Sequence, residues 1–293
     1  MSTPQPGILA PIPAASRHLF FHVNACHDAP RALQALRGLV DGFAVVVGIG
    51  AELAAGLDAP IPGLRPFPSL PGARVPIPYV PYALWCWLRG SDRGELFHTG
   101  REIENALAGV FTLELAIDCF CHRDSRDLTG YEDGTENPVD EAALAAAIVS
   151  HEGDGLDGGS FASVQQWLHD IERFQRLSPG EQDDTVGRSR IDNEELEDAP
   201  DSAHVKRTAQ EDFDPPAFMV RRSMPWTAER RGGLVFLAFG HSPDAFEAVL
   251  RRMSGAEDGI HDALFNFTRP LNGAHYWCPP LLDGRPDWRA LGI

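Results

Sequence analysis

The chain has 293 residues, of which 43% are hydrophobic and 23% are charged, a composition typical of a soluble globular protein with a sizeable core. Forty-two acidic residues against 25 basic ones give a formal net charge of −17, which argues against nucleic acid or a membrane as a partner. No stretch approaches the roughly 18 apolar residues of a membrane span, and five scattered cysteines are typical of reduced thiols, so we expect a cytoplasmic protein.

The first part of the chain predicts six elements, because its apolar residues alternate in some segments and recur with helical spacing in others. They are a strand over 17–24, a helix over 30–43, strands over 44–50 and 82–90, a helix over 99–109 with Thr99 as its N-cap, and a strand over 111–121. This β-α-β-β-α-β order is that of the ferredoxin-like arrangement.

The second part repeats the pattern after an alanine-rich helix predicted over 140–149. The predicted elements are strands over 160–171, 217–226 and 233–240, a helix over 178–187 capped by Ser178, and a helix over 242–253 with Ser242 as cap and Pro243 at its first position. We therefore predict an α+β protein of two ferredoxin-like halves, residues 1–138 and 139–293, with antiparallel sheets and helices packed on them.

The run GYEDGTENP, residues 130–138, holds three acids and two glycines. Gly-x-x-Asp-Gly alone is a common turn pattern, because aspartate bonds its own backbone and glycine supplies a positive φ. The whole run, however, resembles the motif of the dye-decolorizing peroxidases, a family of haem enzymes, and the chain is most similar to their type-B branch. Further matching segments span nearly the whole length: QPGIL, GGSFASVQQWLHDI, AHVKRT, VRRSMP, GLVFLAFG, FEAVLRRM and DGIHDALFNFTRP.

The resemblance assigns the main functional residues. It makes Asp133 the distal aspartate, His204 in AHVKRT the axial ligand of the haem iron, and Arg221 the distal arginine. Arg222 is the neighbouring alternative, but strand alternation puts Arg221 and Ser223 on one face and Arg222 on the other. Ser223, predicted to be catalytic, stands where some type-B members have an asparagine.

These residue types suit peroxide chemistry at one haem b per chain. A ligating histidine usually donates its second ring N–H to a carboxylate, for which Asp262 is the candidate and Asp258 the alternative. Asp133 would take a proton from the peroxide and return it, and Arg221 would stabilise negative charge as the O–O bond breaks.

Other residues are weaker candidates around the cofactor. Thr135, Glu136 and Asn137 would approach the haem edge, while Arg188 and Arg207 would neutralise the propionates or be ordinary surface charges. Leu237 and Phe239 would line the distal pocket unless they belong to the core. Three aromatic residues would relay electrons to the surface, although core packing is favoured for each: Trp226, Tyr276 and Trp277.

The resemblance implies a haem-dependent peroxidase that reduces hydrogen peroxide via a ferryl intermediate and oxidises dyes, phenols or other small-molecule reductants by one-electron steps. Two alternatives are a haem-handling protein, either a carrier or an iron-releasing protein, and a haem-free ligand-binding domain. Relatives commonly form homo-oligomers, so we expect one here. Packaging in a protein nanocompartment is disfavoured, because the chain ends soon after the last family-like segment.

Overall fold

The structure is a computed structural model that describes residues 2–73 and 75–293. Its first half contains, in chain order, β1 (Ala15–Val23), α1 (Ala29–Arg37), β2 (Val45–Gly50), α2 (Ala51–Gly56), β3 (Leu84–Gly90), α3 (Arg93–Leu107) and β4 (Phe111–Phe120), with single 3₁₀ turns at Pro6–Ile8 (η1) and Cys26–Asp28 (η2). The six elements predicted for this half are therefore present, with α1 ending earlier than expected.

The start of α3 differs from the prediction. Thr99 lies inside the helix and does not cap it, because the helix begins at Arg93. Asp92 is the N-cap, and its carboxylate accepts hydrogen bonds from the backbone N–H groups of Gly94 and Glu95 at 2.7 and 3.0 Å. The two glycines in this helix hid its first turns from a propensity-based prediction.

The second half carries more elements than predicted. They are α4 (Asp140–Ala147), β5 (Ser160–His169), α5 (Ile171–Gln175), α6 (Pro179–Val186), α7 (His204–Thr208), η3 (Gln210–Asp212), β6 (Val220–Arg221), β7 (Met224–Ala228), β8 (Arg231–Gly240), α8 (Asp244–Met253), η4 (Ala263–Asn266), β9 (Thr268–Pro270), β10 (Ala274–Cys278), β11 (Leu281–Leu282), β12 (Arg285–Pro286) and η5 (Arg289–Leu291).

Two details of this half concern its helix caps and one of its strands. Ser178 caps α6 as predicted, in a reciprocal capping box with Glu181. Helix α8 begins at Asp244, so Pro243 directly precedes the helix and is not its first residue. The strand predicted over 217–226 is interrupted, because β6 ends at Arg221 and β7 begins at Met224.

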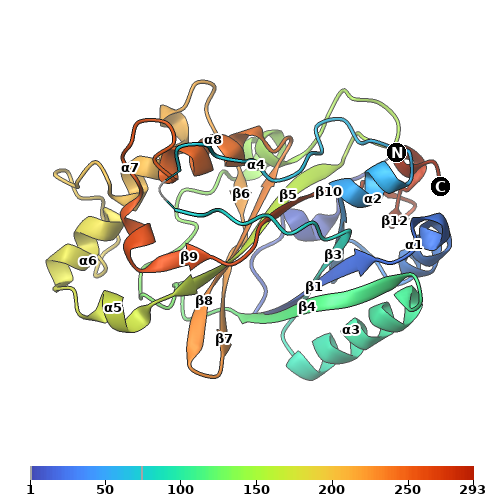
Figure 1. The fold of residues 1–293 in the computed structure, drawn as a ribbon, viewed down its shortest axis with the longest axis horizontal. Coiled ribbons are helices and arrows are strands. Elements are labelled where there is room, and N and C mark those ends of the chain that lie inside the picture. The colour runs from blue at the N-terminus through green and yellow to red at the C-terminus, as the bar shows by residue number, and fades with distance from the viewer. Residues whose placement is uncertain (1, 74) are drawn as a thin grey trace.

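In the described residues, ten strands pair into one antiparallel sheet that closes on itself, and β11 and β12 form a separate two-stranded sheet (Figure 1). The order β4-β1-β3-β2 in the first half matches β10-β5-β8-β7 in the second, and each is the strand order of a ferredoxin-like unit. β2 pairs with β10, and β4 meets β7 at the pair Cys119–Trp226, so the two halves join along both edges. The predicted duplicated fold is confirmed, with the two sheets merged into a barrel.

The inside of this barrel is filled by side chains from both halves, as is usual for a barrel of about eight strands. Large side chains without any exposed surface meet there: Trp85, Trp87, Leu237, Phe239 and Tyr276. In the described part of the chain, these side chains occupy the interior of the barrel.

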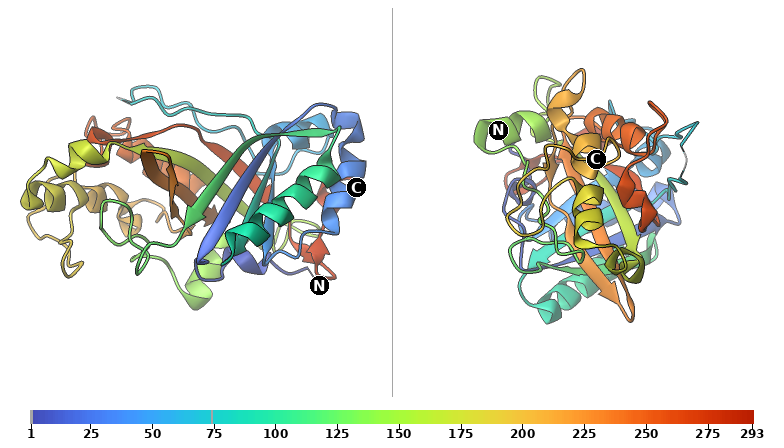
Figure 2. Two further views of the ribbon diagram at one scale, coloured as in Figure 1. Left: turned by 90° about the horizontal axis from the view of Figure 1, so that it is seen from below. Right: turned by 90° about the vertical axis from the view of Figure 1, so that its left-hand side faces the viewer.

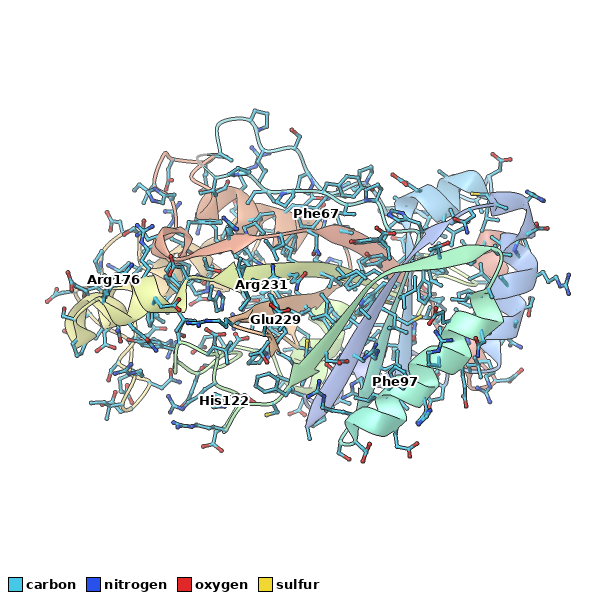
Figure 3. The ribbon with its side chains drawn as sticks, turned by 60° about the horizontal axis from the view of Figure 1, so that its bottom comes forward. Phe67, Phe97, His122, Arg176, Glu229 and Arg231 are labelled. Atoms are coloured by element: carbon cyan, nitrogen blue, oxygen red, sulfur yellow. The ribbon has the colours of Figure 1, made fainter. Side chains whose placement is uncertain are left out.

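Helices cover the outer face of the barrel in both halves. In the first half α1 and α3 pack on β1, β2 and β3, and α3 runs along this part of the sheet in Figure 2. In the second half α8 packs against β5 and β8, together with Phe67 from the long segment between α2 and β3, which is labelled in Figure 3. None of the helices in the described ranges is long and apolar enough to cross a membrane.

Shortening a side chain to alanine should lower the free energy of unfolding by different amounts on the two faces of β8. Leu237→Ala should lower the free energy of unfolding by about 2–5 kcal/mol, because it leaves a cavity in the filled barrel. Leu234→Ala, on the outer face where the side chain is only partly buried, should cost clearly less. Urea denaturation of both variants checks this, and equal losses would contradict the assignment of the two faces.

Candidate active site

A cavity lies outside the barrel, between β5 and β8 on one side and α7 and α8 on the other. Its empty volume, part of it open to solvent, is about 740 Å³. Much of the wall is apolar and is formed by Trp167, Met219, Leu234, Phe236, Phe246, Val249, Leu250, Met253 and Leu264. The polar groups that reach the cavity include Asp133, His169, His204 and Arg221.

His204 is held from behind by a buried carboxylate. Its Nδ1 lies 2.7 Å from Oδ2 of Asp262, which is completely buried, and the other oxygen of Asp262 accepts the backbone N–H of Leu264 at 2.8 Å. A proton on Nδ1 is therefore directed at Asp262, and Nε2, which has no hydrogen-bond partner in the described chain, is left with its lone pair. The structure thus contains the predicted contact between His204 and Asp262.

Asp258, the alternative partner of His204, binds Arg207 instead. The two carboxylate oxygens of Asp258 accept hydrogen bonds from Arg207 at 2.8 and 2.9 Å, and these bonds lower the pKa of Asp258. Arg207 also donates to the carbonyl of Arg252 at 2.7 Å and is buried. Arg207 does not line the cavity, so its predicted contact with a cofactor is wrong.

Asp133 and Arg221 reach the same cavity as His204, from the 130–138 loop and from the end of β6. Asn137 fixes these two segments to each other. Its Nδ2 donates to the carbonyl of Arg221 at 3.0 Å, and its Oδ1 accepts the N–H of Arg221 at 2.8 Å. The buried Nε of Arg221 has no hydrogen-bond partner in the described chain. The Nε atoms of Arg89, Arg207 and Arg222 share this state, so it is the position of Arg221 at the cavity wall that distinguishes this guanidinium.

Ser223 does not enter this cavity. The strand breaks after Arg221, and the Ser223 hydroxyl instead faces the neighbouring strand, where the N–H of Leu237 lies 3.4 Å from its oxygen. Ser223 lines a smaller cavity next to the main one, and Asp133 lines both. The prediction that Ser223 shares a face with Arg221 was wrong, because alternation applies only to an unbroken strand.

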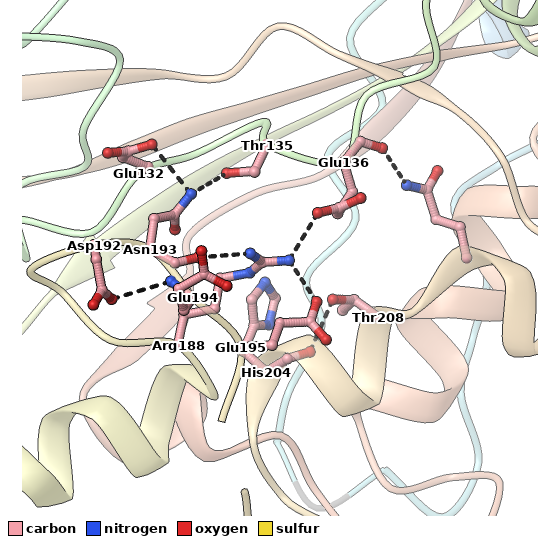
Figure 4. A network of polar contacts seen from close by, with 11 residues as sticks. Glu132, Thr135, Glu136, Arg188, Asp192, Asn193, Glu194, Glu195, His204 and Thr208 are labelled. Atoms are coloured by element: carbon pink, nitrogen blue, oxygen red, sulfur yellow. Dashed lines mark hydrogen bonds and ion pairs between the residues drawn. The ribbon is translucent and has the colours of Figure 1, made fainter. Parts of the chain in front are cut away.

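A polar network forms the mouth of the cavity on the side of His204 (Figure 4). One terminal nitrogen of Arg188 lies between Glu136 and Glu195, at 2.8 and 2.5 Å from their carboxylate oxygens. The other donates to the carbonyl of Asn193 at 2.9 Å, and the amide of Asn193 donates to Thr135 at 3.1 Å. Arg188, Glu136 and Thr135 therefore line the same cavity as His204.

His169 is a cavity residue that the sequence reasoning missed. Its Nδ1 lies 2.6 Å from the hydroxyl of Thr268, and its Nε2 lies 3.2 Å from Oδ1 of Asp127. Burial alone would raise the pKa of Asp127, but the contacts with His169 and Thr129 outweigh burial and lower it. The available signal was a histidine at the end of a strongly apolar predicted strand.

Leu237 and Phe239 were predicted to line the pocket, and this is wrong. Both point into the barrel, and the outward residues Leu234 and Phe236 line the cavity in their place. The alternation was correct, but one strand does not reveal which face meets a cofactor. The aromatic residues Trp226, Tyr276 and Trp277 are buried, so the favoured interpretation as core residues is confirmed.

Comparison with known proteins agrees with this arrangement. The family model described as Dyp-type peroxidase, C-terminal, matches residues 124–283. A dye-decolorizing peroxidase of Mycobacterium tuberculosis is 32% identical over 305 residues, which cover 97% of this chain and 91% of that protein. The chain belongs to the dye-decolorizing peroxidase family. This dye-decolorizing peroxidase is therefore an enzyme, an oxidoreductase that acts as a peroxidase.

Solved structures of related proteins share its fold. A putative Dyp-type peroxidase from Shewanella oneidensis superposes with a TM-score of 0.88 at 30% identity, over 99% of this chain and 98% of that one. A variant of DypB from Rhodococcus jostii in complex with heme has a TM-score of 0.81 at 29% identity, over 93% and 94% of the two chains.

One structural neighbour bears on packaging. The encapsulated Dyp-type peroxidase of Mycobacterium smegmatis has a TM-score of 0.84 at 27% identity, over 95% of this chain and 96% of that one. A chain so similar in extent is packaged, so the expectation that packaging is disfavoured here is not supported.

A polar network that runs from the buried His275 to the surface lies behind the cavity wall, next to Phe246. Ser163 Oγ is 2.9 Å from Nδ1 of His275, and Nε2 of His275 is 3.2 Å from Glu247. Arg65 donates to Glu247 at 2.8 Å and also pairs with Asp244. Burial would raise the pKa of Glu247, but its contacts with His275 and Arg65 outweigh burial and lower the pKa to about 2.

This pKa predicts a loss of stability in acid. Glu247 stays ionised in the folded chain down to about pH 2, whereas its ordinary pKa is 4.5. Its contribution is therefore complete above about pH 5 and is lost as the pH falls towards 2. Arg65→Gln should flatten the fall in unfolding free energy between pH 5 and pH 3, measured by urea denaturation. Arg101→Gln, which removes an exposed ion pair with Glu104, serves as control; identical slopes in wild type and Arg65→Gln would refute the assignment.

Proposed function

We propose that the cavity binds one haem b per chain and that the enzyme uses hydrogen peroxide to oxidise dyes, phenols or other small reductants, one electron at a time. One observation carries this proposal: His204, backed by the buried Asp262, opens onto the same cavity as Asp133 and Arg221. The related DypB structure in complex with heme supports the choice of cofactor.

The residues present fit haem. Histidine is a common axial ligand, and a carboxylate behind it fixes the tautomer and makes the free nitrogen more basic. In this chain Nε2 of His204 is the free nitrogen, and the apolar wall from α8 and β8 suits a flat macrocycle. Gly134, with a φ of 80°, adopts a left-handed conformation that keeps the 130–138 loop tight where it faces the cavity.

We assign proton transfer to Asp133 and the stabilisation of negative charge to Arg221. When bound, haem supplies the iron at which peroxide is reduced. The carboxylate of Asp133 accepts a proton from the incoming peroxide and returns it to the departing oxygen. Arg221 stays protonated, and its guanidinium, which has an unpartnered buried Nε, stabilises the negative charge that develops as the O–O bond breaks.

We propose Arg188 as the arginine that neutralises a haem propionate. It lines the mouth of the cavity together with His204, whereas Arg207 is occupied by Asp258. Glu136 and Glu195 already bind Arg188, so a propionate would share the guanidinium with them or replace one of them. Thr135 and Asn137 contribute by holding the loop in place.

Haem binding tests the role of His204. His204→Ala should lose the Soret band of the haem-loaded protein, and Asp262→Asn should weaken haem binding about 10- to 100-fold, because the ligand loses its orienting partner. Asp258→Asn is the matched control, since Asp258 contacts Arg207 and not His204. A spectrophotometric haem titration measures all three, and an unchanged band in His204→Ala would remove this residue as the ligand.

The reaction with peroxide tests the other side of the cavity. Asp133→Asn and Arg221→Leu should each slow the spectral reaction of the haem-loaded enzyme with peroxide by about 10²-fold or more, without loss of haem. Glu141→Gln, at an exposed position of α4 that is not among the residues lining the cavity, should react like wild type. Rapid mixing with stoichiometric peroxide gives these rates.

The same experiment separates the proposal from its alternative. A haem-handling protein needs to hold haem but has no use for Asp133 and Arg221. A wild-type protein that binds haem and shows no spectral reaction within seconds of mixing would favour a carrier or iron-releasing protein and would overturn the peroxidase proposal.

A further inference from the structure

A groove lined by arginines lies beside the cavity, at the end of β5. Arg173 from α5, Arg230 and Arg231 from the β7–β8 hairpin and Arg269 from β9 line this groove, which has an empty volume of about 850 Å³, part of it open solvent. All four side chains are exposed, and none forms an ion pair with a carboxylate in the described chain. We call it the arginine groove.

The strand register explains why these arginines converge. Leu168, next to the end of β5, pairs with Gly233 of β8 on one side and with Arg269 of β9 on the other. Because β8 begins two residues earlier, at Arg231, it extends beyond the end of β5, where α5 takes over with Arg173. Figure 3 shows this side of the molecule, with Arg231 and Glu229 labelled at the hairpin and Arg176 beyond α5.

The local charge of the groove is opposite to that of the protein. Only two acids line it, Asp170 and Glu172, and the carboxylate of Asp170 is engaged in capping α5 through the N–H of Arg173 at 2.9 Å. The whole chain carries a formal net charge of −17. An anion is therefore repelled by the surface in general and attracted at this groove, which is how a charged patch selects and steers a small ligand.

The groove and the cavity share a wall. His169 and Thr268, joined by a contact of 2.6 Å, line both. Phe265 lines the groove, and its ring centroid lies 5.4 Å from that of Trp167, which lines the cavity. A molecule in the groove is thus separated from the cavity by one layer of side chains and rests beside an aromatic ring.

We propose that the arginine groove is the docking site for an aromatic anion, such as a phenol bearing a sulfonate or carboxylate, which serves as reductant. The arginines bind the acid group and the aromatic residues of the groove contact the ring. Docking stands on the groove alone, whereas the role as reductant rests on the proposed function. Each docked phenol loses one electron across the shared wall and its hydroxyl proton to solvent, and two phenols reduce one hydrogen peroxide to two waters.

A matched pair of substrates and a matched pair of variants test this. The substrates are 6-hydroxynaphthalene-2-sulfonate and the uncharged 2-naphthol, used with the haem-loaded enzyme. The variant Arg231→Gln/Arg269→Gln removes two charges from the groove. The control Arg31→Gln/Arg101→Gln removes two charges from exposed positions on α1 and α3, at the opposite end of the molecule (Figure 1).

The groove variant should raise KM for the sulfonate about three- to tenfold, since each exposed charge contact is individually weak. KM for 2-naphthol, the rate of reaction with peroxide and all constants of the control variant should stay within about twofold of wild type, because exposed charges far from the ligand are screened by salt. Isothermal titration with the sulfonate, in the absence of peroxide, should show the same weakening of binding.

The outcomes separate this inference from the proposed function. Equal effects of both variants on the sulfonate, or turnover of 2-naphthol with an unchanged KM for the sulfonate in the groove variant, would overturn docking and leave the peroxidase intact. Weakened binding of the sulfonate in the groove variant alone, with no turnover of either compound, would support docking and count against the peroxidase. Sodium sulfate that competes as well as the sulfonate would overturn the aromatic part of the proposal.

Discussion

The filled interior of the barrel is the constraint on which the site depends. Side chains at alternate positions of every strand meet inside, and on β8 these are Val235, Leu237 and Phe239. The remaining residues of β8 must face outward, so Leu234 and Phe236 are available to a cavity on the outside. The main cavity accordingly lies between the sheet and the helices that cover it, and Asp133, His169, His204 and Arg221 reach it from neighbouring segments.

The two halves repeat one topology but use their outer layers differently. In the first half α1 and α3 pack densely on the sheet and form its largest apolar cluster. In the second half α8 leaves room, and the connection from β5 to β7 holds α5, α6 and α7, where the corresponding connection from β1 to β2 in the first half holds α1. The loop that carries Asp133 comes from between the halves and crosses to the second. The site is therefore assembled from both halves, although its walls belong to the second.

The sequence predicted strands better than side-chain neighbours. Alternation located β1 to β5 and β8 because a strand with one face in a packed interior leaves a clear pattern. The family resemblance pointed to His204, and the tendency of a ligating histidine to donate to a carboxylate suggested Asp262, 58 positions along the chain, or Asp258. No local pattern relates His204 to Asp262. Arg207 was predicted to contact the cofactor, but its guanidinium binds the carboxylate of Asp258, 51 positions along the chain. The strand breaks after Arg221, so Ser223 does not lie on the expected face. Such errors arise where long-range packing, and not local pattern, sets the direction of a side chain.

The 130–138 loop is fastened at two consecutive residues to opposite sides of the cavity. The carbonyl of Glu136 accepts a hydrogen bond from Gln210, directly after the segment that carries His204, and Asn137 binds the backbone of Arg221. Glu136 and Asn137 therefore connect the side of the cavity that carries His204 to the side that carries Arg221, and they fix the distance between these two sides. A change in this loop is therefore transmitted to both sides of the cavity at once.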